Sequence, residues 1–452
     1  MIEYRNLRIA LLGGGSVGAQ VAALLREHGE ELANRAGAGL ELVGVAVRDL
    51  DAPRTPEIPK HLLTLDAESL ILGADIVIEL MGGIEPARTY ILQAINSGAD
   101  VITANKALLA THGPELFDAA EQVGAQLYYE AAVGGAIPII RPLRDSLAGD
   151  RVERILGIVN GTTNFILDLM DTTGTTLEAA LATATALGYA EADPTADIEG
   201  HDAAQKAAIL ASLAFHTAVP LEAVYREGIT KITTQEVESA RKGGYVVKLL
   251  AICERLIDPK TGVAGVSARV HPALVPLSHP LAAVHGANNA VFLEAEAAGS
   301  LMFYGAGAGG KETASAVLGD LVSAARRHVI GGPGVAESTH ADLPVLPISS
   351  VRTRYQITLS VIDQPGVLAA IAGMFSDHGV SVEAVAQSIG AVAVAVVGDA
   401  VAPAGTDHPQ PTATLVIGTH EAFEADLAAT VAALTSSDVV SAVVSVLRVE
   451  GL

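Results

Sequence analysis

The segment LLGGGSVGAQVAALL limits the possible folds most, because a glycine-rich turn joins a short apolar run to an amphipathic helical pattern. Its glycines Gly13, Gly15 and Gly18 have the GxGxxG spacing of a dinucleotide-binding loop. The first glycine permits the tight turn, the second lets a pyrophosphate approach the backbone, and the third lets the helix pack on the strand. The helix begins near Ser16 and Val17, where its amino terminus favours phosphate charge. We therefore predict that these five residues bind a dinucleotide.

The same alternation of apolar runs and helical patterns continues to about residue 130. The apolar runs are RIALLG, ELVGVAVR, DIVIEL, DVITAN and QLYYEAAV. Strands that alternate with helices at this spacing form a parallel sheet with helices on both faces. We predict an α/β fold, a doubly wound (Rossmann) nucleotide-binding domain over residues 1–135, to which a helix within 305–330 returns.

The end of the second apolar run bears on the choice of cofactor. Arg48 stands there and Asp49 follows it. An acidic residue at this point binds the ribose hydroxyls of NAD, whereas an arginine holds the 2′-phosphate of NADP. Arg48 favours NADP(H), with NAD(H) as a second cofactor. The alternative is that Arg48 is an ordinary surface cation.

The rest of the chain predicts two further units and a connection. Residues 136–304 mix strand patterns with a helix-rich stretch to about residue 255, so we expect an α+β domain. Residues 331–350 have the Gly, Pro and Ser content of a linker. Residues 351–452 alternate as βαββαβ, the order of a ferredoxin-like module, around an insertion at 390–411. We expect a chain that ends at residue 350 to keep a folded, active core.

Composition excludes several classes of protein. A net charge of −23 argues against a nucleic-acid partner, because phosphate contacts need clustered Lys and Arg. No charge-free apolar stretch is long enough to span a membrane, and the amino terminus lacks a signal-peptide pattern, so we expect a cytoplasmic protein without a membrane partner. The single cysteine, Cys253, excludes a cysteine-based zinc site and lies in KLLAICERL, for which we predict an apolar core helix.

The segment GYAEADPTADIEGHDAAQK gathers carboxylates at the entrance to a helix and ends on a lysine. One interpretation is an acidic first turn with an exposed ion pair between Asp202 and Lys206, which lie four residues apart. The other is a reaction site. Hydride addition to a carbonyl builds negative charge on oxygen, so a cation or proton donor must lie beside it.

Taken together, the motifs resemble the homoserine dehydrogenase family with a carboxy-terminal ACT domain. They are GGGSVG, TANKALLA, YEAAVGGAIPII, NGTTNFIL, the acid-rich segment above, and GAGAGG followed by TASAVLGD. The resemblance implies reversible hydride transfer between NAD(P)H and L-aspartate 4-semialdehyde to give L-homoserine, a step in threonine and methionine synthesis. It also implies a homodimer or homotetramer built through the middle domain.

The resemblance also implies roles for individual residues. It makes Lys206 and Lys106 catalytic, with Lys106 also near the cofactor, and adds Gly307 to the cofactor contacts. The substrate-binding residues that it implies are Glu191, Asp197 and Asp202. In NGTTN, the residues Asn160, Gly161 and Thr162 offer backbone N–H groups and a hydroxyl that could hold the substrate carboxylate, and the alternative is an N-cap turn for the helix that follows.

The family also implies a Na⁺ or K⁺ site in YEAAVGGAIPII, at Glu130 and the backbone carbonyls of Val133, Gly135 and Ile137. Oxygen ligands suit a hard cation. The alternative is a plain turn between a strand and a helix.

The tail segment VIDQPGVLAAIAGMF resembles the ACT motif, whose strand-to-helix turn exposes backbone N–H groups to an amino-acid effector. For this pathway the expected effector is L-threonine, and the alternative is a purely structural dimerisation module.

Two other functions are open to a chain of this kind. An aspartate-semialdehyde dehydrogenase would need a nucleophilic cysteine to form a thioester. A ligand sensor would keep the nucleotide-binding fold without catalysis, and the combined presence of Lys106, Glu191, Asp202 and Lys206 argues against it.

Overall fold

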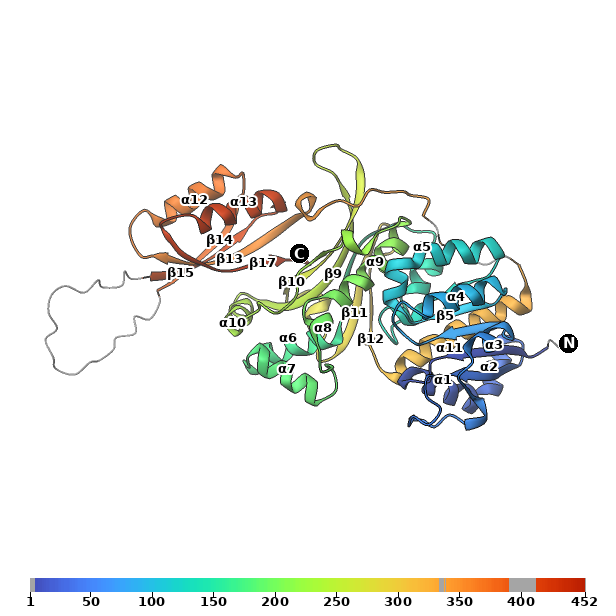
Figure 1. Cartoon of the computed structure of the whole chain (residues 1–452). Coiled ribbons are helices and arrows are strands. Elements are labelled where there is room, and N and C mark those ends of the chain that lie inside the picture. Colours follow the sequence, from blue (N-terminus) through green and yellow to red (C-terminus); the bar gives the residue numbers. More distant parts are fainter. Residues whose placement is uncertain (1–4, 333–336, 338, 390–411, 452) are drawn as a thin grey trace, which may run out of the picture.

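The computed structural model describes residues 5–332, 337, 339–389 and 412–451. Three lobes follow one another in Figure 1, with the amino-terminal lobe at one end and the carboxy-terminal lobe at the other. The insertion at 390–411 lies outside the described residues. Within them, no helix combines the length and the apolar character that crossing a bilayer requires.

The amino-terminal lobe contains a six-stranded parallel sheet in the order β3-β2-β1-β4-β5-β6. This order confirms the doubly wound prediction, and in such sheets ligands bind beyond the carboxyl ends of the strands where the order reverses. Here that point lies between β1 and β4. The strands are β1 (Leu7–Leu12), β2 (Leu40–Ala46), β3 (Leu63–Thr64), β4 (Ile76–Glu79), β5 (Asp100–Thr103) and β6 (Leu127–Tyr128).

Helices cover this sheet, and one of them comes from much later in the chain. α11 (Gly310–Ile330) returns to the amino-terminal lobe, where its buried Val317 and Leu321 share a core with Val21 of α1. The other helices of the lobe are α1 (Ser16–Glu27), α2 (Gly29–Ala36), α3 (Ala67–Leu72), α4 (Ala87–Asn96) and α5 (Lys106–Val123).

The middle lobe is a mixed sheet with helices on it. Its strands are β7 (Val152–Ile158), β8 (Tyr225–Arg226), β9 (Tyr245–Ile257), β10 (Ala264–Pro276), β11 (Asn288–Ala295) and β12 (Gly299–Ala306). Its helices are α6 (Gly161–Thr173), α7 (Leu177–Ala186), α8 (Thr195–Ile198), α9 (His201–Phe215) and α10 (Thr234–Lys242).

The prediction of a helix around Cys253 is wrong, because this residue lies in the middle of strand β9. Nine consecutive residues of β9 are buried, from Val246 to Glu254. A strand buried on both faces has no alternation of polar and apolar residues, so periodicity alone does not distinguish it from a buried helix.

The carboxy-terminal lobe has the predicted βαββαβ order, with α12 and α13 on one face of its sheet (Figure 1). The helices and the sheet enclose a core that includes Leu359, Phe375 and Leu427. The elements are β13 (Arg352–Ile362), α12 (Val367–Asp377), β14 (Val382–Ile389), β15 (Thr412–Thr419), β16 (Ala422–Phe423), α13 (Glu424–Thr435) and β17 (Val440–Val449).

The middle and carboxy-terminal lobes share one continuous sheet. The end of β17 pairs in parallel with β10, joining Ala273 to Arg448 and Leu274 to Val449. Part of the segment for which we predicted a linker is also bound to β10: Val266 N–H donates to the Pro344 carbonyl (2.9 Å), and Leu346 N–H donates to the Val266 carbonyl (2.7 Å). These bonds argue against a freely detachable carboxy-terminal lobe.

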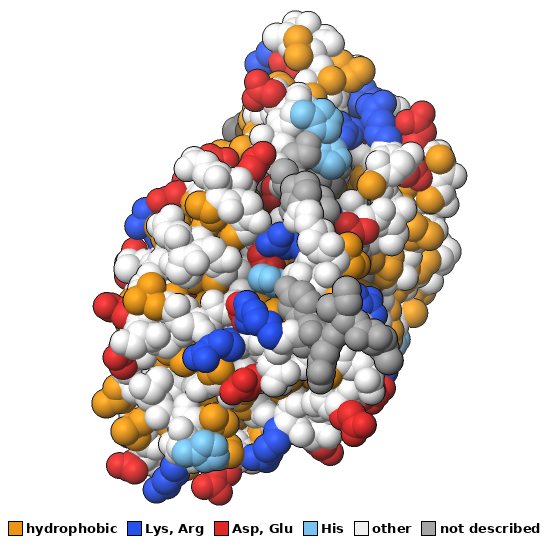
Figure 2. Space-filling model, turned by 90° about the vertical axis from the view of Figure 1, so that its right-hand side faces the viewer, with side chains coloured by type: hydrophobic (Ala, Val, Ile, Leu, Met, Phe, Trp, Pro, Cys, Tyr) orange, Lys and Arg blue, Asp and Glu red, His pale blue; other side chains and the backbone are white. Residues whose placement is uncertain are grey.

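The face of the molecule in Figure 2 carries acidic, basic and hydrophobic side chains interspersed over the described residues. Acidic and basic side chains are therefore interspersed on this face rather than gathered into one charged patch.

Candidate active site

The glycine-rich loop between β1 and α1 has the geometry of a phosphate cradle. A Cβ atom on Gly13 would lie 2.6 Å from the Leu80 carbonyl oxygen, and one on Gly18 would overlap the Gly13 carbonyl. Apart from its two neighbours in the chain, no described residue has an atom within 4 Å of a Cβ placed on Gly15, which caps α1 without a side-chain hydrogen bond. Two glycines are thus required for packing, and the third leaves the first backbone N–H groups of α1 open to an anion.

Two arginines follow β2. Arg48 is exposed just after the strand end. Arg54, which sequence reasoning missed, lies against the glycine loop, because its Nε would be 3.0 Å from a Cβ on Gly14. Its guanidinium donates to the carbonyls of Asp49 and Ala52, the latter at 2.8 Å. The only sign of Arg54 in the sequence was a second arginine six residues after Arg48. The connection that follows β2 has no periodic pattern from which the position of this arginine could be predicted.

The loop that follows β12 brings Gly307 to the same region. Gly310, at the start of α11, lies against the beginning of α1, with its Cβ position 3.2 Å from the Ser16 carbonyl oxygen. A Cβ on Gly307 would overlap the side-chain amide of Asn289, a buried residue that the sequence did not single out. Gly307 is therefore fixed by close packing as well as by its place near the loop.

Two lysines and one carboxylate meet where α5 and α9 approach each other. Lys206 Nζ donates to Asp202 Oδ2 (2.8 Å) and to the Val159 carbonyl (2.6 Å), and Lys106 Nζ lies 3.3 Å from Asp202 Oδ1. The side chains of Asp202 and Lys206 are each 11% exposed, whereas that of Lys106 is 40% exposed. The interpretation of Asp202 and Lys206 as a surface ion pair is wrong, since both are buried.

The electrostatics of this cluster keep Asp202 ionised. Burial opposes its charge, but the two lysines outweigh burial and lower the pKa of Asp202 to about 2. Burial, together with the nearby charge of Asp202, raises the pKa of Asp197 above its usual value, although Asn160 opposes that rise. The two carboxylates thus differ in proton affinity while sharing one neighbour.

That shared neighbour is Asn160, which caps α6. Its Nδ2 donates to Asp197 Oδ1 (2.7 Å) and to Asp202 Oδ2 (2.9 Å), while its Oδ1 accepts from Thr163 N–H (2.8 Å). Thr162 donates its hydroxyl to the Tyr189 carbonyl (2.7 Å). Six of the residues predicted from the sequence therefore lie together: Lys106, Asn160, Thr162, Asp197, Asp202 and Lys206.

Gly161 and Glu191 complete the predicted substrate-binding set. Gly161 is the first residue of α6, and a Cβ there would come 2.6 Å from the Ala287 carbonyl oxygen. Glu191 lies in the exposed connection between α7 and α8 and makes no hydrogen bond or ion pair with the cluster among the residues that the structure describes. Tyr189, two residues before Glu191, is tied to α6 through the Thr162 hydroxyl and through ring contact with Phe165.

The turn after β6 differs from a simple set of cation ligands. The Glu130 carboxylate accepts from the backbone N–H groups of Ile139 (2.6 Å), Ile140 (2.8 Å) and Arg141 (2.9 Å), so its oxygens are already occupied. The carbonyls of Val133 and Gly135 accept no backbone hydrogen bond within the described chain. Both residues are buried, and unpaired carbonyl oxygens of this kind fit a hard monovalent cation.

The thiol of Cys253 is unsuited to covalent catalysis. It is fully buried, its Sγ donates to the Ala207 carbonyl (3.4 Å), and burial raises its pKa to about 12. A nucleophilic cysteine requires an accessible thiolate, so an aspartate-semialdehyde dehydrogenase mechanism does not fit this chain.

Comparison with known proteins is consistent with this geometry. Residues 138–322 match the family model described as homoserine dehydrogenase, residues 13–130 match its NAD-binding domain, and residues 355–400 match the ACT domain. Homoserine dehydrogenase from Corynebacterium glutamicum is 52% identical over 444 residues, which are 98% of this chain and 95% of that protein. The protein of the same name from Mycobacterium leprae is 54% identical over 452 residues, covering 100% of this chain and 99% of that one.

Two solved structures extend the comparison. The crystal structure of a homoserine dehydrogenase from Thiobacillus denitrificans has a TM-score of 0.89 and 38% identity and covers 99% of both chains. A hyperthermophilic archaeal homoserine dehydrogenase in complex with NADPH has a TM-score of 0.60 and 27% identity, covering 73% of this chain and 99% of that one.

Proposed function

The chain belongs to the homoserine dehydrogenase family and is an NAD(P)-dependent oxidoreductase, and from this premise we propose how its residues carry out the reaction. The substrate pair is L-aspartate 4-semialdehyde and L-homoserine. The observation that carries the proposal is the buried carboxylate of Asp202, which binds Lys206 at 2.8 Å and Lys106 at 3.3 Å. NADP(H), when bound, supplies or accepts the hydride.

Lys206 is proposed to move the proton. A protonated lysine has three N–H donors, and Lys206 uses two of them on Asp202 and Val159. The third remains for the aldehyde oxygen, to which it donates a hydrogen bond and then a proton as the carbonyl is reduced. In the reverse direction the neutral amine takes the proton of the homoserine hydroxyl.

Lys106 and the acids are proposed to stabilise and orient the substrate. The Lys106 ammonium, more exposed than Lys206, stabilises the negative charge that develops on the substrate oxygen. Asp197 and Glu191 attract the substrate ammonium, while Gly161 at the amino terminus of α6 and Thr162 receive its carboxylate. Asn160 holds Asp197 and Asp202 in one arrangement through its two amide hydrogens.

NADP(H) is proposed as the preferred cofactor, with NAD(H) as the alternative. Arg48 is exposed at the end of β2, and Arg54 lies beside Gly14 of the glycine loop. Guanidinium groups at this place suit a 2′-phosphate. The archaeal relative that binds NADPH adds support by analogy.

A Na⁺ or K⁺ ion is proposed in the turn after β6. The carbonyl oxygens of Val133, Gly135 and Ile137 would hold it, with the backbone carbonyl of Glu130 rather than its occupied carboxylate. Such an ion would stiffen the turn, whose Gly135 lies against the Gly307 carbonyl.

L-threonine is proposed as an effector of the ACT domain. A cavity of about 390 Å³ lies at the turn between β13 and α12, lined by residues 361–368 with Gln387 and Leu415. Gly366 caps α12 without a side-chain hydrogen bond, so the helix amino terminus is open to a carboxylate. Inhibition by millimolar L-threonine would support the proposal, and activity that is unchanged by it would refute it.

Assembly into a homodimer or homotetramer through the middle lobe is also proposed. β12 is an edge strand of the large sheet and exposes Tyr304, with 56% of its surface accessible. An edge strand with apolar side chains favours pairing with a second copy. Light scattering of the purified protein measures the mass, and a monomer would contradict this proposal.

The direct test of the reaction is oxidation of L-homoserine with NADP⁺ by the purified enzyme. We expect formation of NADPH that depends on homoserine, and no reaction with L-serine, whose hydroxyl lies one carbon closer to the ammonium. Equal rates with the two amino acids would show that the acids and α6 do not position the substrate as proposed.

A further inference from the structure

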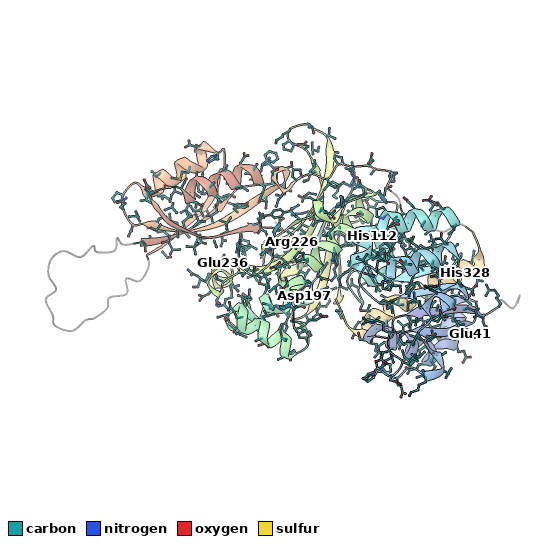
Figure 3. The ribbon with its side chains drawn as sticks, viewed as in Figure 1. Glu41, His112, Asp197, Arg226, Glu236 and His328 are labelled. Atoms are coloured by element: carbon teal, nitrogen blue, oxygen red, sulfur yellow. The ribbon has the colours of Figure 1, made fainter. Side chains whose placement is uncertain are left out.

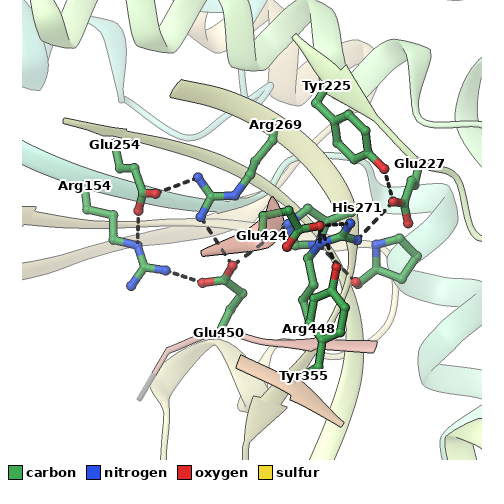
Figure 4. Close-up of polar contacts among 11 residues, drawn as sticks. Arg154, Tyr225, Glu227, Glu254, Arg269, His271, Tyr355, Glu424, Arg448 and Glu450 are labelled. Atoms are coloured by element: carbon green, nitrogen blue, oxygen red, sulfur yellow. Dashed lines mark hydrogen bonds and ion pairs between the residues drawn. The ribbon is translucent and has the colours of Figure 1, made fainter. Parts of the chain in front are cut away.

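A partly buried network of charged side chains joins the carboxy-terminal lobe to the middle lobe (Figure 4). Arg448, near the end of β17, donates from Nε to Glu424 Oε1 (3.0 Å) within its own lobe and from Nη1 to Glu227 Oε1 (3.0 Å) in the middle lobe. Tyr225 also donates its hydroxyl to Glu227, and Tyr355 donates to Glu424 (2.7 Å). The Glu227 carboxylate is therefore held from both lobes.

Glu227 belongs to a short segment that supports the substrate side of the site. Its N–H donates to the Val270 carbonyl (2.7 Å), which fixes it on β10 beside β8. Two residues later, Ile229 N–H donates to the Ile198 carbonyl (2.7 Å) at the end of α8. Residues 227–229 thus connect the contact with Arg448 to the turn that follows Asp197.

Close packing makes this support rigid. A Cβ on Gly228 would overlap the backbone of Ile198 and Glu199, and Arg226 donates to the Glu199 carbonyl. Gly200, which has a φ of 80° and is the N-cap of α9, has its Cβ position 3.4 Å from the Glu227 carbonyl oxygen. Figure 3 labels Arg226 and Asp197, which both lie in the middle lobe.

The same turn fixes the groups that the reaction needs. Gly200 N–H donates to the Asp197 carbonyl (2.9 Å), and the helix that starts immediately afterwards carries Asp202 and Lys206. A shift of the 227–229 segment would therefore move Asp197 relative to Asn160 and change the direction in which α9 begins. Small displacements of positioned groups have large effects on substrate binding and turnover.

We propose that Arg448 and Glu227 are positioning residues through which the carboxy-terminal lobe holds the substrate side of the active site in place. The inference rests on the proposed function, because it takes Asp197, Asp202 and Lys206 as the groups that meet the substrate. It also provides a physical route by which a change in the carboxy-terminal lobe reaches that site, since β17 carries Arg448 at its end.

The test compares Glu227→Gln with Glu222→Gln in the full-length enzyme. Both substitutions remove one negative charge, and Glu222 is an exposed residue that makes no ion pair among the described residues. The Glu227 side chain is 41% exposed, so the glutamine variant should fold. We expect Glu227→Gln to raise the KM for L-homoserine by about 5–10-fold, the equivalent of one weakened charged hydrogen bond. The KM for NADP⁺ should stay within about twofold of wild type, since the glycine loop is untouched.

Arg448→Lys supplies the second variant. Lysine keeps the charge but lacks the planar fork that reaches Glu424 and Glu227 together. We expect Arg448→Lys also to raise the KM for L-homoserine. Combining it with Glu227→Gln should raise this KM little further, because both substitutions break the same contact between Arg448 and Glu227.

Three results would overturn the inference. They are a KM for L-homoserine in Glu227→Gln that equals that of Glu222→Gln, a parallel rise in the KM for both substrates, and simple additivity of the two substitutions. Failure of the proposed function is a separate outcome, because it would appear as a wild-type enzyme that does not oxidise L-homoserine.

Discussion

Replacing Glu450 by glutamine should destabilise the whole chain, because it leaves buried positive charge without compensation. Four side chains form a quartet next to the Arg448 contact (Figure 4). Arg154 and Arg269 supply two positive charges, and Glu254 and Glu450 supply two negative ones. Arg269 is 1% exposed and Glu450 is 3% exposed in their side chains. His271 adds no charge, because burial, with Arg448 and Arg269 nearby, holds its pKa well below the usual value.

The expected loss can be worked from the geometry. Arg269 Nη2 lies 3.3 Å from Glu450 Oε1, and Arg154 donates to the other oxygen of the same carboxylate. At an effective dielectric constant of about 20, unit charges 3.3 Å apart attract by about 5 kcal/mol. Removing one partner of a buried pair typically costs about 3–5 kcal/mol. We therefore expect Glu450→Gln to lower the free energy of unfolding by about 3–5 kcal/mol.

The assay is denaturation in urea, followed by circular dichroism and by loss of activity. Glu421→Gln is the matched control, because Glu421 pairs with Arg352 at 3.4 Å on the surface, where both side chains are about half exposed. That pair should contribute less than about 1 kcal/mol. Adding Arg154→Met to Glu450→Gln restores neutrality and should recover part of the loss. The reasoning is refuted if Glu450→Gln costs no more than Glu421→Gln, or if Arg154→Met lowers stability further.

Three other predictions concern the site and a buried lysine. Lys206→Ala should lower turnover by roughly 10²–10⁴-fold while NADPH still binds, measured by steady-state kinetics and fluorescence titration, and near-normal turnover would exclude its role in proton transfer. Arg48→Ala and Arg54→Ala should each raise the KM for NADP⁺ far more than the KM for NAD⁺. A variant that raises the two KM values equally would show that its arginine does not bind the 2′-phosphate. Burial lowers the pKa of Lys248 to about 8, so the unfolded chain binds more protons above that pH. The free energy of unfolding should therefore rise by about 2 kcal/mol more in wild type than in Lys248→Met between about pH 8 and about pH 10, and identical pH profiles would contradict this prediction.

The sequence was sufficient for the parts of the fold that local patterns specify. The GxGxxG spacing and the regular alternation of apolar runs predicted the parallel sheet, and the tail predicted the βαββαβ module. Both depend on periodicities of a few residues. β9 lacked such a signal because it is buried on both faces, and the helix predicted around Cys253 was therefore wrong.

The site was predicted only in part, for a related reason. Spacing places Asp202 and Lys206 on one helical face, but the same spacing occurs in exposed ion pairs. Their burial depends on Val159 at the end of β7, which accepts from Lys206 across 47 residues of sequence. Arg154 and Glu450 are 296 residues apart, so no local pattern could have paired them. The expectation of a detachable carboxy-terminal lobe is revised for the same reason, because ending the chain at residue 350 would remove Glu450.

The central claim is that Asp202 organises two lysines for hydride transfer to and from the substrate, and Asp202→Asn tests it most directly. The measurement is the turnover of NADP⁺-dependent L-homoserine oxidation, together with the Kd for NADPH, for wild type, Asp202→Asn and the exposed control Asp193→Asn. The account predicts that Asp202→Asn lowers turnover by roughly 10²-fold or more with an unchanged Kd for NADPH, because Lys206 and Lys106 lose their common anion. Turnover in Asp202→Asn that matches Asp193→Asn would contradict it.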